Sequence, residues 1–293
     1  MANEIMIQEG VVFGNDGGGD LLCDTYTPIS PSGAAVLLLY GGGWRNGDKS
    51  RMRDHAMDMA GHGLVAIAAN YRLTGDAPWP AQIHDVKAAI RWIRANAGSL
   101  GIDPDKIAVQ GYSAGAHLGL LATGTPGVPA FEGRGGNVGV SSAVNAMVAF
   151  FPPVLFHVGS ERPSGATSGR PLLGDAETSE LAYEVSPLNY ASADFPSTFL
   201  LHGTADHMVP PSASVRMHEA LSQAGATVEM HLYPGVEHEF ISQPGMHGPV
   251  HAEVANFLNR ELIEPDRFRE EAAATTERFA DILRTRAEAA GTS

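Results

Sequence analysis

The sequence has almost no cysteine, since Cys23 is the one thiol among 293 residues. A lone cysteine cannot form an internal disulfide, and nothing near it supplies Cys or His at the spacing of zinc ligands. We therefore expect neither a disulfide framework nor a bound metal.

Clustered basic residues are also missing. The chain carries 19 Lys and Arg against 33 Asp and Glu, which gives a formal net charge of −14. Neutralising the phosphates of nucleic acid or of an anionic membrane requires grouped Lys and Arg. We expect no nucleic-acid partner and no membrane partner.

Long apolar stretches are absent as well. The longest strongly apolar run, residues 34–40, is far too short to cross a bilayer. Residues 1–10 contain two glutamates, no Lys or Arg and no long apolar stretch, so they lack the parts of a secretory signal. The expectation is a soluble, cytoplasmic protein.

The apolar residues that are present alternate between two periods. Short buried-strand patterns occur at residues 34–40, 64–69, 107–110, 144–151, 199–202 and 228–233. Between them, apolar residues recur at helical spacing, for example at Ile83, Val86, Ile90 and Ile93. Residues 5–13 and 21–26, split by a Gly-rich turn, predict an antiparallel hairpin. Together these patterns predict an α/β fold, whose mostly parallel, twisted, eight-stranded sheet has helices on both faces and an antiparallel N-terminal edge.

The predicted single domain covers residues 1–263. Two Gly- and Pro-rich stretches, at about 124–143 and 152–190, predict long loops that cover a site; the alternative is a surface excursion. Residues 264–293 predict an amphipathic helix, because Phe268, Ala272, Phe279, Ile282 and Leu283 recur at helical spacing. Three fates remain open for this helix: packing on its own domain, pairing with another subunit in a homo-oligomer, or fraying.

The strongest chemical signal is Gly111-Tyr112-Ser113-Ala114-Gly115, which lies between a predicted strand and a predicted helix. This G-x-S-x-G pattern in this context is typical of a nucleophile elbow. The turn is so tight that side chains two residues either side of the serine would clash, hence glycine at both positions. Ser113 is therefore the candidate nucleophile; a plain Gly-rich turn is the alternative.

A serine hydroxyl needs a base, and the base needs an acid to orient it. Asp206 follows the strand at 199–202, and His238 follows the strand at 228–233, so all three residues are expected at one edge of the sheet. Competing acids are Glu237 and Asp175. The other histidines considered are His202, expected to pack or fix a loop; His207, beside the acid; His247, in a Gly-rich turn; and His251, in the next helix.

A tetrahedral oxyanion also needs hydrogen-bond donors. Three glycines follow the strand at 34–40, and we expect the amides of Gly42, Gly43 and Ala114 to be these donors. The alternative for the glycines is a simple strand-to-helix turn. An apolar acyl or aryl pocket is expected from aromatic residues near strand ends or in the covering loops, although such residues often belong to the core: Trp44, Trp79, Tyr112, Phe151 and Phe156.

Six motifs in order, within residues 40–240, resemble the esterase/lipase branch of the α/β-hydrolase superfamily. They are Tyr40 to Arg45 with Gly47-Asp48-Lys49, Asn70-Tyr71-Arg72-Leu73, Trp79 to Asp85, the serine elbow, Gly203 to Pro210, and Glu237-His238. This branch includes hormone-sensitive-lipase-like carboxylesterases, bacterial feruloyl-esterase-like enzymes and kynurenine formamidases. Two departures stand out: Tyr40 replaces the usual histidine before the oxyanion loop, and Tyr112 replaces the glutamate common before the serine.

The resemblance implies an α/β-hydrolase fold and hydrolysis of carboxylic esters through an acyl-enzyme, without a cofactor. The expected function is a serine carboxylesterase acting on small-molecule esters with short acyl or aryl groups. An amidase-type hydrolase such as an aryl formamidase is the alternative, because the same groups serve both reactions. A non-catalytic ligand receptor on this fold is a third hypothesis.

Overall fold

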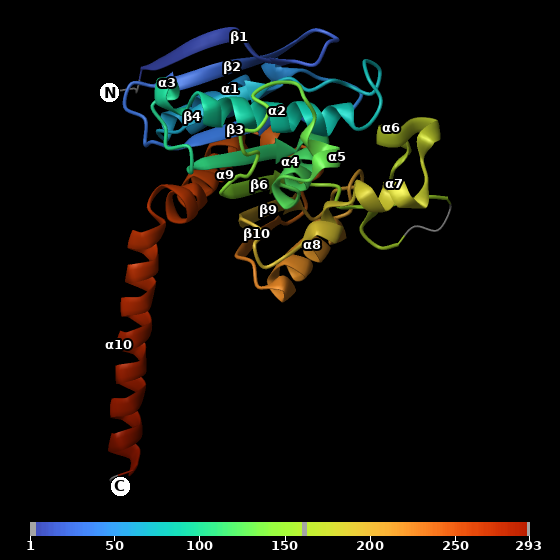
Figure 1. Cartoon of the computed structure of the whole chain (residues 1–293). Coiled ribbons are helices and arrows are strands. Elements are labelled where there is room, and N and C mark those ends of the chain that lie inside the picture. The colour runs from blue at the N-terminus through green and yellow to red at the C-terminus, as the bar shows by residue number, and fades with distance from the viewer. Residues whose placement is uncertain (1–3, 160–162, 292–293) are drawn as a thin grey trace.

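A central sheet of eight strands organises the computed structural model, which describes residues 4–159 and 163–291 (Figure 1). The spatial order is β1-β2-β4-β3-β5-β6-β9-β10. The strands are β1 (Ile5–Asn15), β2 (Asp20–Pro28), β3 (Ala35–Leu39), β4 (Val65–Ala69), β5 (Ile107–Tyr112), β6 (Ala146–Phe150), β9 (Ser197–Gly203) and β10 (Val228–Tyr233). β1 and β2 are antiparallel to each other, β2 is antiparallel to β4, and the remaining pairs are parallel. The predicted sheet, including its antiparallel edge, is confirmed.

The apolar composition of the central strands explains their position. Every residue of β3, β4, β5 and β6 is buried, whereas the edge strands β1 and β10 are partly exposed. A strand with apolar side chains on both faces must be covered on both faces. The sheet therefore needs two layers of helices.

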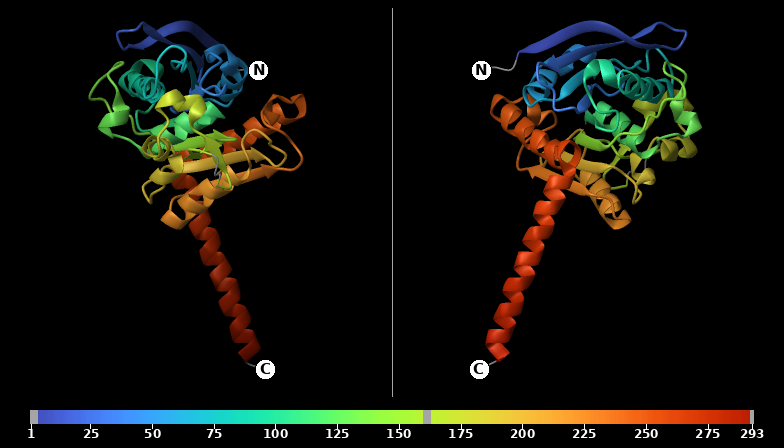
Figure 2. Two further views of the ribbon diagram at one scale, coloured as in Figure 1. Left: turned by 90° about the vertical axis from the view of Figure 1, so that its right-hand side faces the viewer. Right: turned by 60° about the vertical axis from the view of Figure 1, so that its left-hand side comes forward.

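Those layers are visible in the two views of Figure 2. α1 (Arg53–Gly61) and α9 (Pro244–Leu258) pack together on one face. α2 (Ala81–Ala95), α4 (Ala114–Gly124) and α8 (Ser212–Ala224) cover the other. The predicted apolar face of α2 is confirmed, since Ile83, Val86, Ile90 and Ile93 are at most 1% exposed. Short helical turns complete the body at η1 (Lys49–Met52), α3 (Ala97–Leu100), η4 (Phe240–Ser242) and η5 (Asn259–Ile263).

The first expected loop contains a short helix, α5 (Pro129–Glu132), and is fixed to the body by charge. Glu132 lies 2.9 Å from Lys87 Nζ and 3.0 Å from Arg91 NH1, and both cations are nearly fully buried on α2. A carboxylate between two buried cations holds its segment in place. The segment is therefore held against α2, and its role as a cover over a site stays a prediction.

The second expected loop is more regular than the sequence indicates. It contains β7 (Leu155–His157), β8 (Ala166–Ser168), α6 (Arg170–Leu173), η2 (Gly174–Ala176), α7 (Ser179–Glu184) and η3 (Pro187–Tyr190), while residues 160–162 lie outside the described residues. Elements of three to six residues are too short to display a periodic pattern. β7 and β8 pair with each other and not with the main sheet.

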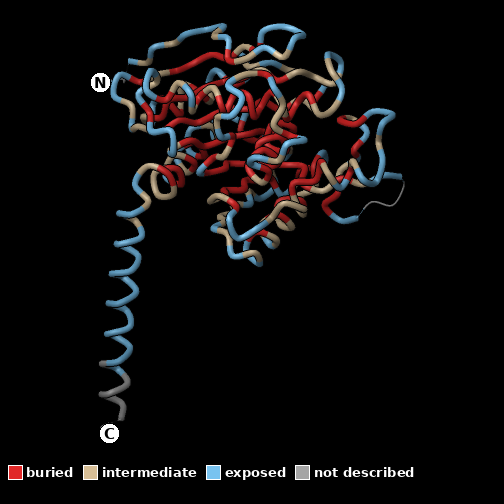
Figure 3. Tube along the Cα trace, in the orientation of Figure 1, coloured by how far each residue is buried: buried red, intermediate tan, exposed pale blue. Residues whose placement is uncertain are grey.

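The predicted C-terminal helix is present as α10 (Pro265–Gly291) and extends away from the body as a rod (Figure 1). Its N-terminal end contacts η5, and the side chains from residue 269 to 284 are exposed along its length (Figure 3). Phe279, Ile282 and Leu283 are 62%, 42% and 53% exposed. The helix thus does not lie on its own domain in this structure, and pairing with another subunit stays a prediction.

A search of the described helices for a bilayer-crossing segment finds none with sufficient length and apolar character.

Replacing Glu132 with alanine should lower the free energy of unfolding by about 3 kcal/mol, because Lys87 and Arg91 would stay buried without their carboxylate. Urea denaturation measures the loss. Asp175→Ala is the control: Asp175 pairs with Arg170 on the surface, where removal of one partner changes stability little. Equal small losses in both variants would show that Glu132 does not anchor the loop.

Candidate active site

Ser113 occupies a strained turn between β5 and α4, with φ 50° and ψ −115°. A β-carbon on Gly111 would lie 2.5 Å from Gly115 O, and one on Gly115 would lie 2.2 Å from Leu39 O. Both distances are too short for real atoms, so the steric reason for the two glycines is confirmed. A non-glycine residue at positive φ is held there only when its surroundings leave no alternative.

The structure brings Ser113, His238 and Asp206 into one line of contacts. His238 Nε2 lies 3.1 Å from Ser113 Oγ, and His238 Nδ1 lies 2.6 Å from Asp206 Oδ2. The His238 side chain is 6% exposed and that of Asp206 is fully buried. One imidazole can therefore accept the serine proton at Nε2 while donating from Nδ1 to the carboxylate.

The surroundings of Asp206 keep it ionised. Oδ1 accepts hydrogen bonds from the amides of Met208 at 2.8 Å and Val209 at 2.9 Å, and His202 Nε2 lies 3.2 Å from Oδ2. Burial by itself raises the pKa of Asp206. The hydrogen bonds from His202, His238 and the Val209 amide outweigh that effect, and the pKa lies below its ordinary value.

The two competing acids, Glu237 and Asp175, pair with residues other than His238. Glu237 pairs with His207 at 2.8 Å, and both side chains are more than half exposed. Asp175 is 95% exposed and pairs with Arg170.

The other histidines have different surroundings. As expected, His202 fixes a loop: it is buried, with Nδ1 2.7 Å from Ser214 Oγ and Nε2 3.0 Å from Val209 O. The expectation that His247 lies in a Gly-rich turn is wrong, because α9 begins at Pro244 and includes it. His251 lies in the same helix. A proline in the first helical position is well tolerated, which lets the helix start before the glycines.

Two tyrosines brace the loop that follows β3. Tyr40 Oη donates to Tyr71 O at 3.0 Å, Tyr71 Oη donates to Tyr40 O at 2.9 Å, and the rings stack 4.4 Å apart. Burial raises the pKa of both hydroxyls above their ordinary value, so both stay protonated as donors. This reciprocal pair connects the loop to the end of β4, and it gives Tyr40, one of the two departures noted in the sequence, a bracing role.

Of the three expected oxyanion donors, Ala114 follows Ser113 directly, and Gly42 and Gly43 lie in the loop after β3, whose first glycine contacts the elbow. Gly41 is so close to the elbow that a β-carbon on it would lie 3.2 Å from Ser113 Cβ. Gly42 has φ 136°, and a β-carbon there would lie 1.9 Å from Asn46 O, so this turn requires glycine. Ala114 begins α4, where the first backbone amides have no acceptor within the helix. Gly43, next to Gly42, has open space where a β-carbon would be.

Other motif residues build the scaffold. Lys49 N donates to Asn70 Oδ1 at 2.7 Å, and Lys49 Nζ lies 2.6 Å from Asp24 Oδ1. Arg72 makes a bidentate contact with Asp85, through Nε at 2.8 Å and NH2 at 2.7 Å. These bonds connect the ends of β3 and β4 to each other and to α2.

A cavity of about 400 Å³ lies next to the serine elbow, and its lining includes residues adjacent to Ser113 and His238 in the chain, Tyr112 and Glu239, but none of the three proposed catalytic side chains. Tyr112 and Phe151 line it together with Gly41, Met52 and His55. The Phe151 ring centroid lies 4.4 Å from that of His238. Of the five aromatic residues expected in a substrate pocket, the structure brings these two next to the site.

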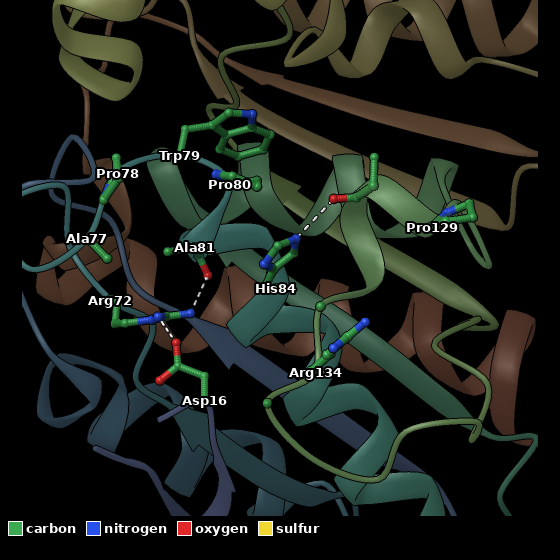
Figure 4. Close-up of a pocket in the computed structure, with 13 residues that line it drawn as sticks. Asp16, Arg72, Ala77, Pro78, Trp79, Pro80, Ala81, His84, Pro129 and Arg134 are labelled. Carbon is green, nitrogen blue, oxygen red and sulfur yellow. Dashed lines mark hydrogen bonds and ion pairs between the residues drawn. The ribbon is translucent and has the colours of Figure 1, made fainter. Parts of the chain in front are cut away.

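The remaining three aromatic residues lie elsewhere. Trp44 and Phe156 pack against each other, with ring centroids 5.8 Å apart, and Trp44 Nε1 donates to His117 Nδ1 at 3.1 Å. Neither lines the 400 Å³ cavity, and both are at most 5% exposed, as Tyr112 and Phe151 also are. Trp79 lines another cavity, of about 560 Å³, at the start of α2; Figure 4 shows it facing the same space as His84 and Arg134. None of the three proposed catalytic side chains lines that cavity.

Sequence reasoning missed a group of side chains behind the 400 Å³ cavity: His55, Asp58, His247 and His251. The sequence does contain a signal for this group. His55 and Asp58 are three residues apart on α1, and His247 and His251 are four residues apart on α9. Each spacing places two side chains on one helix face, but only the packing of α1 against α9 brings the two pairs together.

The fold and the site define an α/β-hydrolase, as expected. The BD-FAE family model matches residues 23–221, and the chain belongs to this family, in the esterase/lipase branch. The esterase LipQ of Mycobacterium tuberculosis is 32% identical over 237 residues, which cover 76% of this chain and 55% of LipQ. This chain spans about half the length of the first curated relatives it matches, from 43% to 59%.

Two solved structures are similar over most of the chain. A truncated carbohydrate esterase from gut microbiota has a TM-score of 0.77 at 28% identity and covers 90% of this chain and 98% of its own. The propionate-bound esterase Est2 of the Planctomycetes species Thermogutta terrifontis has a TM-score of 0.73 at 29% identity and covers 89% and 94%.

Buried His117 predicts acid sensitivity of the fold. Burial lowers its pKa from 6.5 to about 4, although its bond to Val185 O opposes this shift. Between these two values the unfolded chain binds the proton and the folded chain does not, so stability falls as the pH drops from 6.5 to 4, by up to about 3 kcal/mol.

Urea unfolding of the wild type and of His117→Gln at several pH values tests this expectation. Glutamine does not titrate, so the variant should lose less stability than the wild type across the same window, whatever its stability at neutral pH. Identical pH slopes would contradict the assignment.

Proposed function

We propose that this chain is a serine carboxylesterase that works through an acyl-enzyme on Ser113. The observation that carries the proposal is the continuous path from Ser113 Oγ through His238 to buried Asp206, at 3.1 and 2.6 Å. The family membership and the esterases among its relatives support the same reaction.

In the proposed mechanism, Ser113 Oγ attacks the ester carbonyl while His238 Nε2 takes its proton. Asp206 holds Nδ1–H and stabilises the imidazolium that forms. The amides of Gly42, Gly43 and Ala114 donate to the oxyanion, each contributing on the order of a hundredfold or more in rate. His238 then protonates the leaving alcohol, and water repeats the sequence to release the acid.

The substrate class follows from the cavity beside the serine. Its volume of about 400 Å³ and its aromatic walls, Tyr112 and Phe151, fit a short acyl or aryl group. The Thermogutta esterase has been solved with propionate and with butyrate bound, which supports acids of this size. We propose short-chain acyl and small aryl esters as substrates.

Ser113→Ala should lower the turnover of p-nitrophenyl acetate and butyrate by at least about 10⁴-fold, because the nucleophile is lost. Wild-type rates should fall from butyrate to decanoate as the acyl chain outgrows the cavity. They should also be lower on a formanilide than on the matched aryl ester. Absorbance at 405 nm follows the nitrophenyl esters, and circular dichroism checks that the variant folds.

Ser222→Ala is the matched control, since Ser222 is an exposed serine on α8, and it should keep wild-type turnover. A folded Ser113→Ala enzyme that retained the wild-type rate would refute the mechanism. A faster formanilide reaction would move the proposed substrate class from esters to amides.

A further inference from the structure

Two helices on one face of the sheet place four metal-ligand side chains together. His55 and Asp58 lie three residues apart on α1, and His247 and His251 lie four apart on α9. The ligand atoms of the three histidines are all within 4.8 Å of one another. A pair of histidines at this four-residue spacing on a helix is an arrangement that binds zinc in other proteins.

A hydrogen bond to the backbone determines which ring nitrogen of His251 could bind a metal ion. His251 Nδ1–H donates to His247 O at 2.8 Å, so Nε2 is the ring nitrogen that carries the lone pair and accepts hydrogen bonds. That atom lies 3.0 Å from His55 Nδ1. Metal-bound histidines commonly donate their other N–H to a backbone carbonyl in this way, and the bond fixes the ring.

Asp58 adds a carboxylate next to two of these histidines: its side chain is 38% exposed, and its Oδ2 lies 2.8 Å from His247 Nε2 and 3.6 Å from His251 Nδ1. That oxygen is buried, and despite these distances it has no hydrogen-bond partner among the described residues. A buried carboxylate oxygen without a hydrogen bond is unfavourable, and a cation between it and the imidazoles would satisfy it.

We propose that His55, Asp58, His247 and His251 bind one divalent cation of the zinc class. Three imidazole nitrogens and one carboxylate oxygen form a tetrahedral set that suits zinc or cobalt, whereas magnesium and calcium prefer oxygen ligands. Ligand bonds of about 2.0–2.1 Å require neighbouring ligand atoms about 3.3 Å apart. The ligand atoms of the three histidines, which lie within 4.8 Å of one another, would move closer together on binding, and the Asp58 carboxylate would turn towards them. The lone cysteine led us to expect no metal; that reasoning considered only ligands close together in the chain.

The position of this site gives the ion a structural consequence. It would connect α1 to α9, the helix that follows the loop of His238. His55 also lines the cavity beside Ser113, and Tyr112 Oη lies 3.3 Å from His251 Nε2. A bound ion would therefore stiffen the wall of that cavity. The inference does not rest on the proposed esterase reaction.

Metal binding is measured on the purified, chelator-treated full chain. Cobalt(II) should bind one ion per chain and show the intense visible absorption of a tetrahedral site. Zinc(II) in excess should raise the melting temperature by about 5 °C, and magnesium(II) should leave it unchanged.

The variant His247→Ala should weaken cobalt binding at least about tenfold and remove the zinc-induced shift. Asp58→Asn is a second, milder variant and should weaken binding in the same direction. His218→Ala, on α8 and away from the cluster, is the control and should behave as the wild type. The proposal is overturned if no stoichiometric tetrahedral cobalt signal forms, or if the variants at both cluster positions bind as tightly as the wild type.

Discussion

The strained backbone of Ser113 is the constraint around which this structure is built. The turn exists because a side chain on Gly111 would collide with Gly115 across it, because one on Gly115 would collide with the end of β3, and because neighbouring elements hold both ends. Ser113 N donates to Phe150 O at 3.0 Å, and His117 N donates to Ser113 O at 2.9 Å. Such a conformation costs about 1–3 kcal/mol. The burial of every residue of β5 and of nearly all of α4 offsets that cost, so the serine hydroxyl is presented by well-packed elements.

Asp206 and the loop after β3 are each held in place by hydrogen bonds from residues at or after strand ends. Asp206 is held by the amides of its own loop and by His202 on β9. The loop after β3 is held by the Tyr40–Tyr71 pair, which reaches the end of β4. Because parallel strands end at one edge, these separate supports converge on a single site. The positions of the reacting atoms therefore follow from the sheet.

Local sterics made part of this site predictable from the sequence. The elbow glycines indicate Ser113, and the strand ends indicate Asp206 and His238, because each of these signals is short-range. The positions of the aromatic residues could not be predicted in this way. Trp44 and Phe156 lie in the core because of contacts with residues distant in the chain. The histidine cluster was not predicted for the same reason, because it depends on contacts between distant parts of the chain: His55 and His251 are 196 positions apart. The role of Tyr40 depends on Tyr71, which follows β4 and lies 31 positions away in the chain.

Covalent trapping tests the central claim most directly, namely that Ser113 is an activated nucleophile. The protein is treated with a fluorophosphonate, and intact-mass and peptide mass spectrometry locate the adduct. The account predicts one adduct per chain, on the peptide that contains Ser113, and none after prior heat denaturation. An adduct on a different residue, or no adduct on the folded protein, would contradict it.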